Sequence, residues 1–145
     1  MTRILVTGSR HGWPYGELRD VLDDILREWG VNPPPVLVHG AAPGVDSQAA
    51  AIWKSWGLPV EAHPADWETL GKKAGPIRNE EMVKSGADAC VAFLDTNSKG
   101  TADCIRRAKR DGIPVAVYKR TPDYARNTET VPGQLSFFSD PTKEK

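Results

Sequence analysis

Three short segments that contain glycine each follow an apolar run of the sequence, and the first and third also carry hydroxyl and cationic side chains. They are Thr7-Gly8-Ser9-Arg10, His39-Gly40-Ala41-Ala42-Pro43-Gly44-Val45-Asp46 and Asn97-Ser98-Lys99-Gly100-Thr101. The second and third segments each lie at the start of a stretch with helical periodicity. The free N–H groups at the start of a helix favour the binding of a phosphate. Together the three segments predict a cradle for a polyphosphate or a ribose phosphate. None of them is a G-x-G-x-x-G fingerprint or a P-loop.

Taken singly, residues of these segments also have ordinary structural interpretations. Gly8 and Gly40 fit simple turns. Asp46 fits a charge at the start of a helix as well as it fits a ribose ligand. The joint placement of the segments, rather than any one residue, therefore carries the prediction of a binding site.

A fourth segment, residues 65–82, gathers polar groups, an aromatic ring and several cations. Trp67 is suited to stacking on a base, and Arg78 to bidentate contact with a phosphate. The alternative is a long loop in which Trp67 is buried as a lid. Lys72 and Lys73 are expected to be ordinary surface charges. The residues expected to contact a ligand are Gly8, Ser9, Arg10, Gly40, Ala41, Ala42, Gly44, Asp46, Asp66, Trp67, Arg78, Asn79, Ser98, Lys99, Gly100 and Thr101.

Other reactive side chains do not form a recognisable centre. The three histidines lack the spacing of a metal site, and Ser9 has no evident histidine partner for a hydrolase triad. Cys90 is expected in the core. Cys104 lies in the first turn of a helix, where a thiolate is favoured, but a buried and inert thiol is the expectation. We therefore predict neither a metal nor a required cofactor.

The elements that must position these residues follow from the hydrophobic pattern. Apolar runs at residues 4–6, 36–38, 58–62, 89–94 and 113–118 are continuous, as in strands of a parallel sheet that is covered on both faces. Helical patterns lie between them, at about residues 18–29, 45–56, 76–86 and 101–111. This order predicts an α/β, Rossmann-like three-layer sandwich with a mainly parallel sheet of five or slightly more strands.

The location of the site follows from the strand order. In a doubly wound sheet, ligands bind beyond the carboxyl ends of the strands, where the strand order reverses. If the order is 3-2-1-4-5, the first and fourth strands flank that point. The segments Gly8-Ser9-Arg10 and 97–101 then face each other across one crevice.

Length and charge set further limits. The chain has 145 residues, which predicts one domain at residues 1–120 and a polar tail at 121–145. Nineteen basic residues balance nineteen acidic ones, so no global field favours nucleic acid or a membrane. No apolar run approaches the roughly 18 residues of a membrane span, and the first residues do not resemble a signal peptide. A cytoplasmic protein is expected.

The four segments, together with Ser98-Lys99-Gly100-Thr101-Ala102-Asp103, resemble one group of proteins. In this order, over residues 3 to about 118, they are similar to the SLOG superfamily of Rossmann-like proteins, in its YspA/YpsA-related branch. The resemblance implies a nucleotide-related ligand. A homodimer is expected by the same analogy.

Better-known relatives imply different functions. The LOG phosphoribohydrolases use an Arg in an R-x-x-x-M motif, which residues Arg78 to Met82 match. They also use the final Glu of a P-G-G-x-G-T-x-x-E motif, and Cys104 occupies the position of that Glu here. The loss of that Glu argues against N-glycoside cleavage, with Asp103 and Glu80 as possible replacement carboxylates beside Arg78 as catalytic residue. The DprA group, which binds single-stranded DNA, has a G-x-A-x-G-x-D element that Gly40 to Asp46 resembles, but zero net charge does not favour DNA. Other SLOG domains sense NAD- or ADP-ribose-derived messengers.

The tail contains Gln134-Leu135-Ser136-Phe137-Phe138. It resembles the pentapeptide by which bacterial replication and repair proteins bind the DNA sliding clamp, with Gln134, Leu135, Phe137 and Phe138 as contacts on a polar tether. The alternative is that these side chains fold back over the core.

Taken as a whole, the sequence predicts a sensor or sequestering protein with an AMP-, ADP-ribose- or NAD-like ligand. A phosphoribohydrolase and a clamp- or single-stranded-DNA-associated accessory protein are the alternatives.

Overall fold

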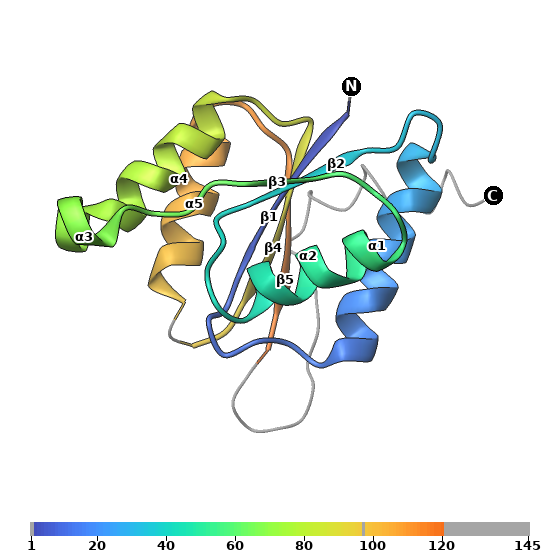
Figure 1. Cartoon of the computed structure of the whole chain (residues 1–145), viewed down its shortest axis with the longest axis horizontal. Coiled ribbons are helices and arrows are strands. Elements are labelled where there is room, and N and C mark those ends of the chain that lie inside the picture. Colours follow the sequence, from blue (N-terminus) through green and yellow to red (C-terminus); the bar gives the residue numbers. More distant parts are fainter. Residues whose placement is uncertain (1, 97, 121–145) are drawn as a thin grey trace.

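The computed structural model describes residues 2–96 and 98–120. The tail predicted at residues 121–145, with its clamp-like motif at Gln134, Leu135, Phe137 and Phe138, lies outside the described residues, as does Asn97. The described residues form one sheet with helices on both of its faces (Figure 1).

Five parallel strands form the sheet. They are β1 (Arg3–Gly8), β2 (Val36–His39), β3 (Val60–Ala62), β4 (Ala89–Leu94) and β5 (Val115–Lys119). Their order is β3-β2-β1-β4-β5, and every neighbouring pair is parallel. The predicted fold class is therefore confirmed. The strand order is the one that was assumed in locating the site, and it reverses between β1 and β4.

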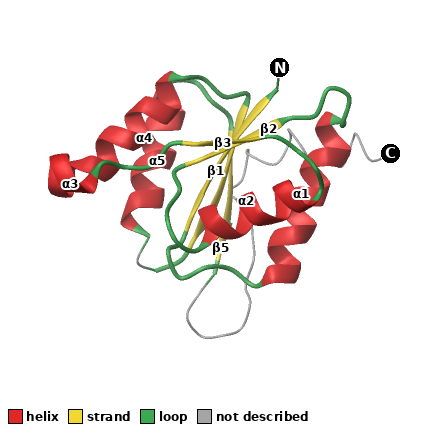
Figure 2. Ribbon diagram, in the orientation of Figure 1, coloured by secondary structure: helices red, strands yellow, loops and turns green. Residues whose placement is uncertain are grey.

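Helices cover the sheet in two layers, which Figure 2 shows on either side of the strands. They are α1 (Tyr15–Trp29), α2 (Val45–Ser55), α3 (Trp67–Leu70), α4 (Ala74–Lys84) and α5 (Lys99–Arg110), with a 3₁₀ turn at Gly71–Lys73. Side chains of α1 and α2 pack on Ile4 and Val6 of β1, whereas α4 and α5 pack on the opposite face, which includes Leu5. Because successive strand residues point to opposite faces, a strand with both faces covered needs a continuous apolar run.

Some element boundaries differ from the sequence-based prediction. The helix expected to begin at Pro76 begins at Ala74, after the short α3 and the 3₁₀ turn that the sequence did not reveal. Proline is tolerated at the third helical position because the N–H groups of the first turn have no partner within the helix. The third and fifth strands begin at Val60 and Val115, two residues later than expected.

The ends of α1 and α5 agree with the glycine signals. Gly30 follows α1 with φ 81°, and Gly112 lies just beyond α5 with φ 80°. Such left-handed backbone is readily adopted only by glycine, which is why these residues end the helices. Within the described part of the chain, no helix is long and apolar enough to cross a membrane.

Candidate functional site

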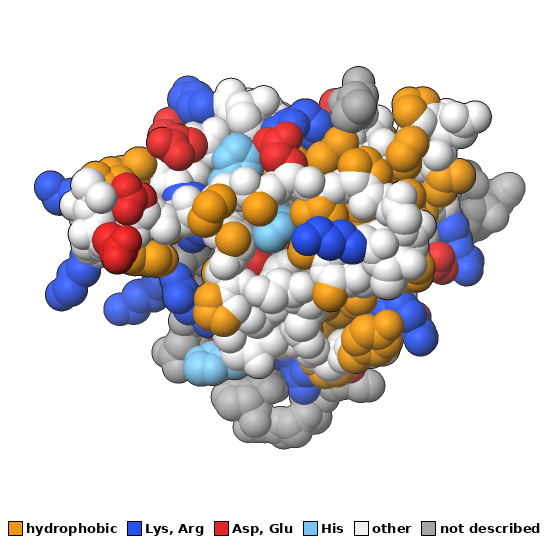
Figure 3. All heavy atoms as spheres, in the orientation of Figure 1, with side chains coloured by type: hydrophobic (Ala, Val, Ile, Leu, Met, Phe, Trp, Pro, Cys, Tyr) orange, Lys and Arg blue, Asp and Glu red, His pale blue; other side chains and the backbone are white. Residues whose placement is uncertain are grey.

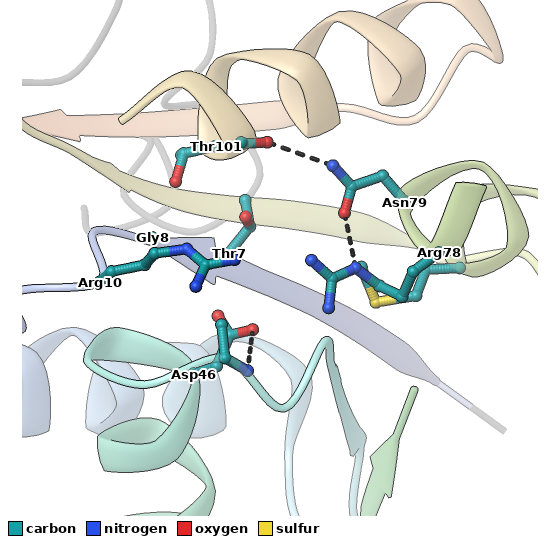
Figure 4. Close-up of a pocket in the computed structure, with 10 residues that line it drawn as sticks. Thr7, Gly8, Arg10, Asp46, Arg78, Asn79 and Thr101 are labelled. Atoms are coloured by element: carbon teal, nitrogen blue, oxygen red, sulfur yellow. Dashed lines mark hydrogen bonds between the residues drawn. The ribbon is translucent and has the colours of Figure 1, made fainter. Parts of the chain in front are cut away.

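A small cavity lies at the carboxyl end of β1, beside the point where the strand order reverses (Figure 4). Its volume of about 40 Å³ has room for about three water molecules. The first turns of α2 and α5 and the side of α4 complete its walls. The lining residues are Thr7, Gly8, Arg10, Ala42, Asp46, Arg78, Asn79, Met82, Gly100 and Thr101.

Arg78 is the buried cation of this cavity, with 8% of its surface exposed. Its Nη1 donates to the carbonyl oxygen of Gly40, and its Nε donates to Oδ1 of Asn79 at 2.9 Å. Burial lowers the pKa of the guanidinium, and the nearby carboxylate of Asp46 opposes that shift. Among described residues, no carboxylate lies within ion-pair distance of Arg78, and Nη2 has no acceptor. Figure 4 shows the end of the guanidinium directed into the cavity.

Asn79 holds Arg78 in place from the side of α5. Its Nδ2 donates to the carbonyl oxygen of Gly100 at 3.2 Å and to Oδ2 of Asp103 at 3.0 Å. Since its Oδ1 accepts from Arg78, the hydrogen-bonding capacity of the amide is largely used within the protein. Asn79 therefore orients the arginine, and it also lines the cavity, where the sequence predicts a ligand contact.

The loop between β2 and α2 uses most of its backbone donors internally. Oδ2 of Asp46 accepts from the N–H groups of Gly40 at 3.0 Å and Ala42 at 3.3 Å, and Nδ1 of His39 accepts from Ala41 at 2.9 Å. These N–H groups are not free for a phosphate, which differs from the expectation of a phosphate cradle in this loop. Ala41 has a φ of 59°, an uncommon value for a residue with a side chain. The internal hydrogen bonds compensate for that local conformation.

The same loop packs tightly on the loop that follows β1. The N–H of Val45 donates to the carbonyl oxygen of Ser9 at 3.0 Å. A Cβ built on Gly44 would lie 2.5 Å from the carbonyl carbon of Arg10, and one built on Gly8 would lie 2.7 Å from the Cβ of Val45. Gly8 and Gly44 are therefore required for the close packing of these two loops, and Gly8 also lines the cavity.

The loops after β1 and β4 meet, as the strand order predicts. The hydroxyl of Ser9 donates to Oδ2 of Asp95 at 2.6 Å, and the hydroxyl of Ser98 donates to Oδ1 of the same carboxylate at 2.8 Å. Asp95 thus joins the two loops across the switch point. Ser9 and Ser98 were expected to bind the ligand, but neither lines the cavity. Lys99 is exposed at the start of α5, while Thr101, in the same turn, is buried and lines the cavity.

Arg10 and Trp67 extend the site beyond the cavity. The guanidinium of Arg10 lies 5.4 Å from the centroid of the Trp67 ring, a cation–π distance. Trp67 is 46% exposed and rests on Gly75 of α4, where an added Cβ would come within 3.2 Å of the ring. The alternative of a buried lid is therefore wrong. Asp66 caps α3 by accepting the N–H of Thr69 at 3.2 Å and does not line the cavity.

The two carboxylates considered as replacements for the missing Glu are held outside the cavity. Glu80 accepts hydrogen bonds from Arg107 at 2.8 Å and Arg110 at 3.0 Å, which lower its pKa. Asp103 pairs with Arg106 and with Arg107, the latter at 2.9 Å. Neither carboxylate lines the cavity. Asp103 is linked to the site by its hydrogen bond with Asn79, and its charge also raises the pKa of Arg78.

The cysteines lie beneath the site in the core. Both are fully buried, and the hydrogen bond to Cys104 together with burial raises the pKa of the Cys90 thiol. The expectation of a buried Cys104 is confirmed.

Burial lowers the pKa of His39, whose Nδ1 already accepts a backbone N–H. In the described ranges, no three His, Cys, Asp or Glu side chains are grouped so that they could hold a metal ion.

The sequence did not identify two of the lining side chains, Thr7 and Met82. Thr7 belongs to the first glycine-containing segment, but its position in that segment does not indicate that its side chain faces the site. Met82 is the last residue of the R-x-x-x-M motif, and its residue type does not indicate a ligand contact. Thr7 is next to Gly8, and Met82 is two residues after Glu80, both of which the sequence predicts as site residues. The sequence therefore located the correct strand and helix, but it did not give the directions of their side chains.

Comparisons with known proteins agree with this architecture. The profile of the YspA, cpYpsA-related SLOG family matches residues 2–69. The Gene 61 protein of Mycobacterium phage D29 is 43% identical over 131 residues, an alignment that covers 84% of this chain and all of that protein.

The fold is also found in a solved structure. The X-ray structure of TM1055, a structural genomics target, superimposes with a TM-score of 0.59 over 79% of this chain and 72% of that one. The sequence identity is 23%, so this similarity concerns the fold alone.

Proposed function

Because the chain belongs to the YspA, cpYpsA-related SLOG family, we propose that it binds a nucleotide or nucleotide-derived ligand at the carboxyl edge of its sheet, as a sensor or sequestering protein. The family resemblance that the sequence motifs predicted is confirmed. The ligand is proposed to be an AMP-, ADP-ribose- or NAD-like compound whose phosphate contacts Arg78.

The observation that carries this proposal is the buried guanidinium of Arg78. Transferring a cation out of water is unfavourable unless other groups compensate for the lost hydration. Arg78 has two neutral hydrogen-bond partners, Gly40 and Asn79, and within the described residues it has no ion pair. An anionic ligand in the cavity would supply the missing counter-charge. A phosphate also offers the oxygens that a guanidinium binds well.

The size of the cavity limits what enters it. A volume of about 40 Å³ accommodates a group of the size of a phosphate, not a complete nucleotide. The remainder of the ligand is proposed to extend toward Arg10 and the exposed ring of Trp67, on which a base can stack. On the face shown in Figure 3, cationic and acidic side chains are interspersed, which favours a small ligand over a nucleic-acid strand.

The placement of the carboxylates favours binding over N-glycoside cleavage. The Glu of the LOG motif is replaced by Cys104, which is fully buried. Asp103 and Glu80 are paired with arginines of α5 outside the cavity. A phosphoribohydrolase that uses Arg78 with either of them would need to break these ion pairs, and it is therefore the less favoured alternative.

A thermal-shift screen with AMP, ADP, NAD, ADP-ribose and its cyclic derivatives tests the proposal, with release of free base followed by chromatography in the same mixtures. A ligand at 100 times its Kd stabilises the fold by about 2.7 kcal/mol, which corresponds to several degrees for a chain of this size. Stabilisation by one of these compounds, lost in Arg78→Ala, is the expected result. If none of them stabilises the fold, the proposed function is wrong.

A further inference from the structure

Asp46 is a second buried charge of the cavity, and its two carboxylate oxygens have different environments. The side chain belongs to the first turn of α2, and the residue is only 4% exposed. Oδ2 accepts both backbone hydrogen bonds from the β2–α2 loop, those of Gly40 and Ala42. Oδ1 has no hydrogen-bond partner among residues 2–96 and 98–120, and Figure 4 shows one carboxylate oxygen directed toward the cavity.

Two cations flank this carboxylate without pairing with it. Arg10 and Arg78 line the same cavity, and both lower the pKa of Asp46 electrostatically. Neither lies within ion-pair distance of the carboxylate in the described part of the chain. The cavity thus presents cationic donors on two sides and an acceptor oxygen between them. Burial, the larger effect, raises the pKa of Asp46 to about 6.

A bare phosphate matches only part of this arrangement, because its oxygens would face the carboxylate and be repelled. A ligand that fits Arg10, Arg78 and Asp46 together carries a hydrogen-bond donor close to its anionic group. Ribose 5-phosphates have this property, since hydroxyl groups lie on the sugar that bears the phosphate. A planar base has N–H donors too, but in a nucleotide the sugar separates the base from the phosphate.

We propose that Asp46 accepts a hydrogen bond from a ribose hydroxyl, so that the site selects ribonucleotides over their deoxy counterparts. This inference rests on the proposed function and identifies the substrate class of the same site. Asp46 is then a specificity-determining residue, while Arg78 binds the phosphate. The carboxylate supplies a charge-assisted hydrogen bond, the stronger kind.

A purely structural role for Asp46 is the alternative explanation, and the geometry allows the two roles to be separated. The structural hydrogen bonds both reach Oδ2. In Asp46→Asn, the amide oxygen can still accept both N–H groups and hold the loop. The atom that faces the cavity becomes an NH₂ group, which donates instead of accepting. A structural role predicts no change in ligand selectivity in this variant.

The test measures the Kd of AMP, 2′-deoxy-AMP, 3′-deoxy-AMP and inorganic phosphate by calorimetry, with the full chain and with Asp46→Asn. The control is Asp20→Asn, because Asp20 lies on the exposed surface of α1. For the unaltered protein, at least one deoxy analogue is expected to bind about ten- to hundredfold more weakly than AMP, as for loss of a hydrogen bond to a charged group. Asp46→Asn is expected to weaken AMP binding, to abolish the discrimination and to bind inorganic phosphate at least as well.

Equal affinity of the unaltered protein for AMP and for both deoxy analogues would overturn the role of Asp46 while leaving the proposed function intact. Discrimination that persists undiminished in Asp46→Asn would do the same. If the unaltered protein binds neither AMP nor phosphate, the proposed function fails and this inference fails with it. Far-UV circular dichroism of the variants establishes that they remain folded.

Discussion

The guanidinium of Arg78 occupies the space that a Cβ on Gly40 would take, and it donates a hydrogen bond to the carbonyl oxygen of Gly40. A Cβ built on Gly40 would lie 2.7 Å from Cζ of Arg78, closer than any real contact. The glycine of the β2–α2 loop is thus needed for the position of an arginine that comes from α4, 38 residues later in the chain.

Gly40→Ala is therefore expected to displace Arg78 and to weaken nucleotide binding about tenfold or more, while the fold is retained. The clashing atoms belong to the end of a flexible side chain, so the arginine can move without a large loss of stability. Calorimetric titration with the ligand found in the screen, together with thermal unfolding, measures both effects. Gly16→Ala is the matched control, since a Cβ at Gly16 meets no atom within 4 Å. Unchanged affinity in Gly40→Ala would contradict the role assigned to Arg78.

Arg78→Lys is expected to bind the ligand about ten- to hundredfold more weakly, although it keeps the positive charge. A lysine ammonium cannot contact Gly40 and Asn79 while also directing a second nitrogen of a planar fork into the cavity. Loss of a hydrogen bond to a charged group corresponds to about 1.5–3 kcal/mol. Binding assays at low and high salt check the result. Full affinity in the lysine variant would show that charge alone suffices.

The stability of the protein is expected to depend on pH through Asp46. Its pKa is raised by burial to about 6 in the folded state, whereas it is about 3.9 in an unfolded chain. The folded state therefore binds this proton more tightly, and the free energy of unfolding falls as the pH rises from about 4 to about 6. The contribution is about 2–3 kcal/mol, and it changes little above pH 6.

Urea unfolding of the ligand-free protein and of Asp46→Asn at several pH values measures this contribution. The difference between the two free energies of unfolding isolates Asp46, because other groups titrate in both proteins. A difference that stays constant between about pH 4 and about pH 6 would refute the raised pKa.

Incubation with AMP is expected to release no adenine, because neither Asp103 nor Glu80 faces the cavity. Chromatography after prolonged incubation detects even slow cleavage. If adenine is released, the variants Asp46→Asn, Asp103→Asn and Glu80→Gln identify the carboxylate responsible. Loss of release in Asp103→Asn or Glu80→Gln alone would restore the phosphoribohydrolase alternative with the residues first expected from the sequence.

The clamp-like motif remains a prediction from sequence alone. Leu135→Ala combined with Phe137→Ala is expected to abolish binding to a bacterial sliding clamp, because the apolar anchors carry most of the energy of such peptides. Nucleotide affinity should not change in this double variant. Surface plasmon resonance with immobilised clamp is the measurement. Equal clamp binding by the variant and the unaltered protein would exclude this role of the motif.

The sequence by itself determined the order of the elements, the parallel sheet and the edge of that sheet where the candidate site is expected, whereas the strand order was an assumption. Hydrophobic periodicity is a local property, and parallel strands with right-handed crossovers leave few topologies. The family also followed from short motifs, since these are contiguous in the chain. Arg78, which lines the cavity, could be predicted as a site residue because its residue type and its segment were both unusual.

Only the tertiary structure decided which of the predicted side chains face the cavity. The direction of a side chain depends on the rotation of its helix and on the partners that neighbouring loops offer. Ser9 and Ser98 turn to Asp95, and Glu80 turns to the arginines of α5. The second oxygen of Asp46 is left for the cavity because the β2–α2 loop folds back on the first one, a contact that no spacing in the sequence encodes.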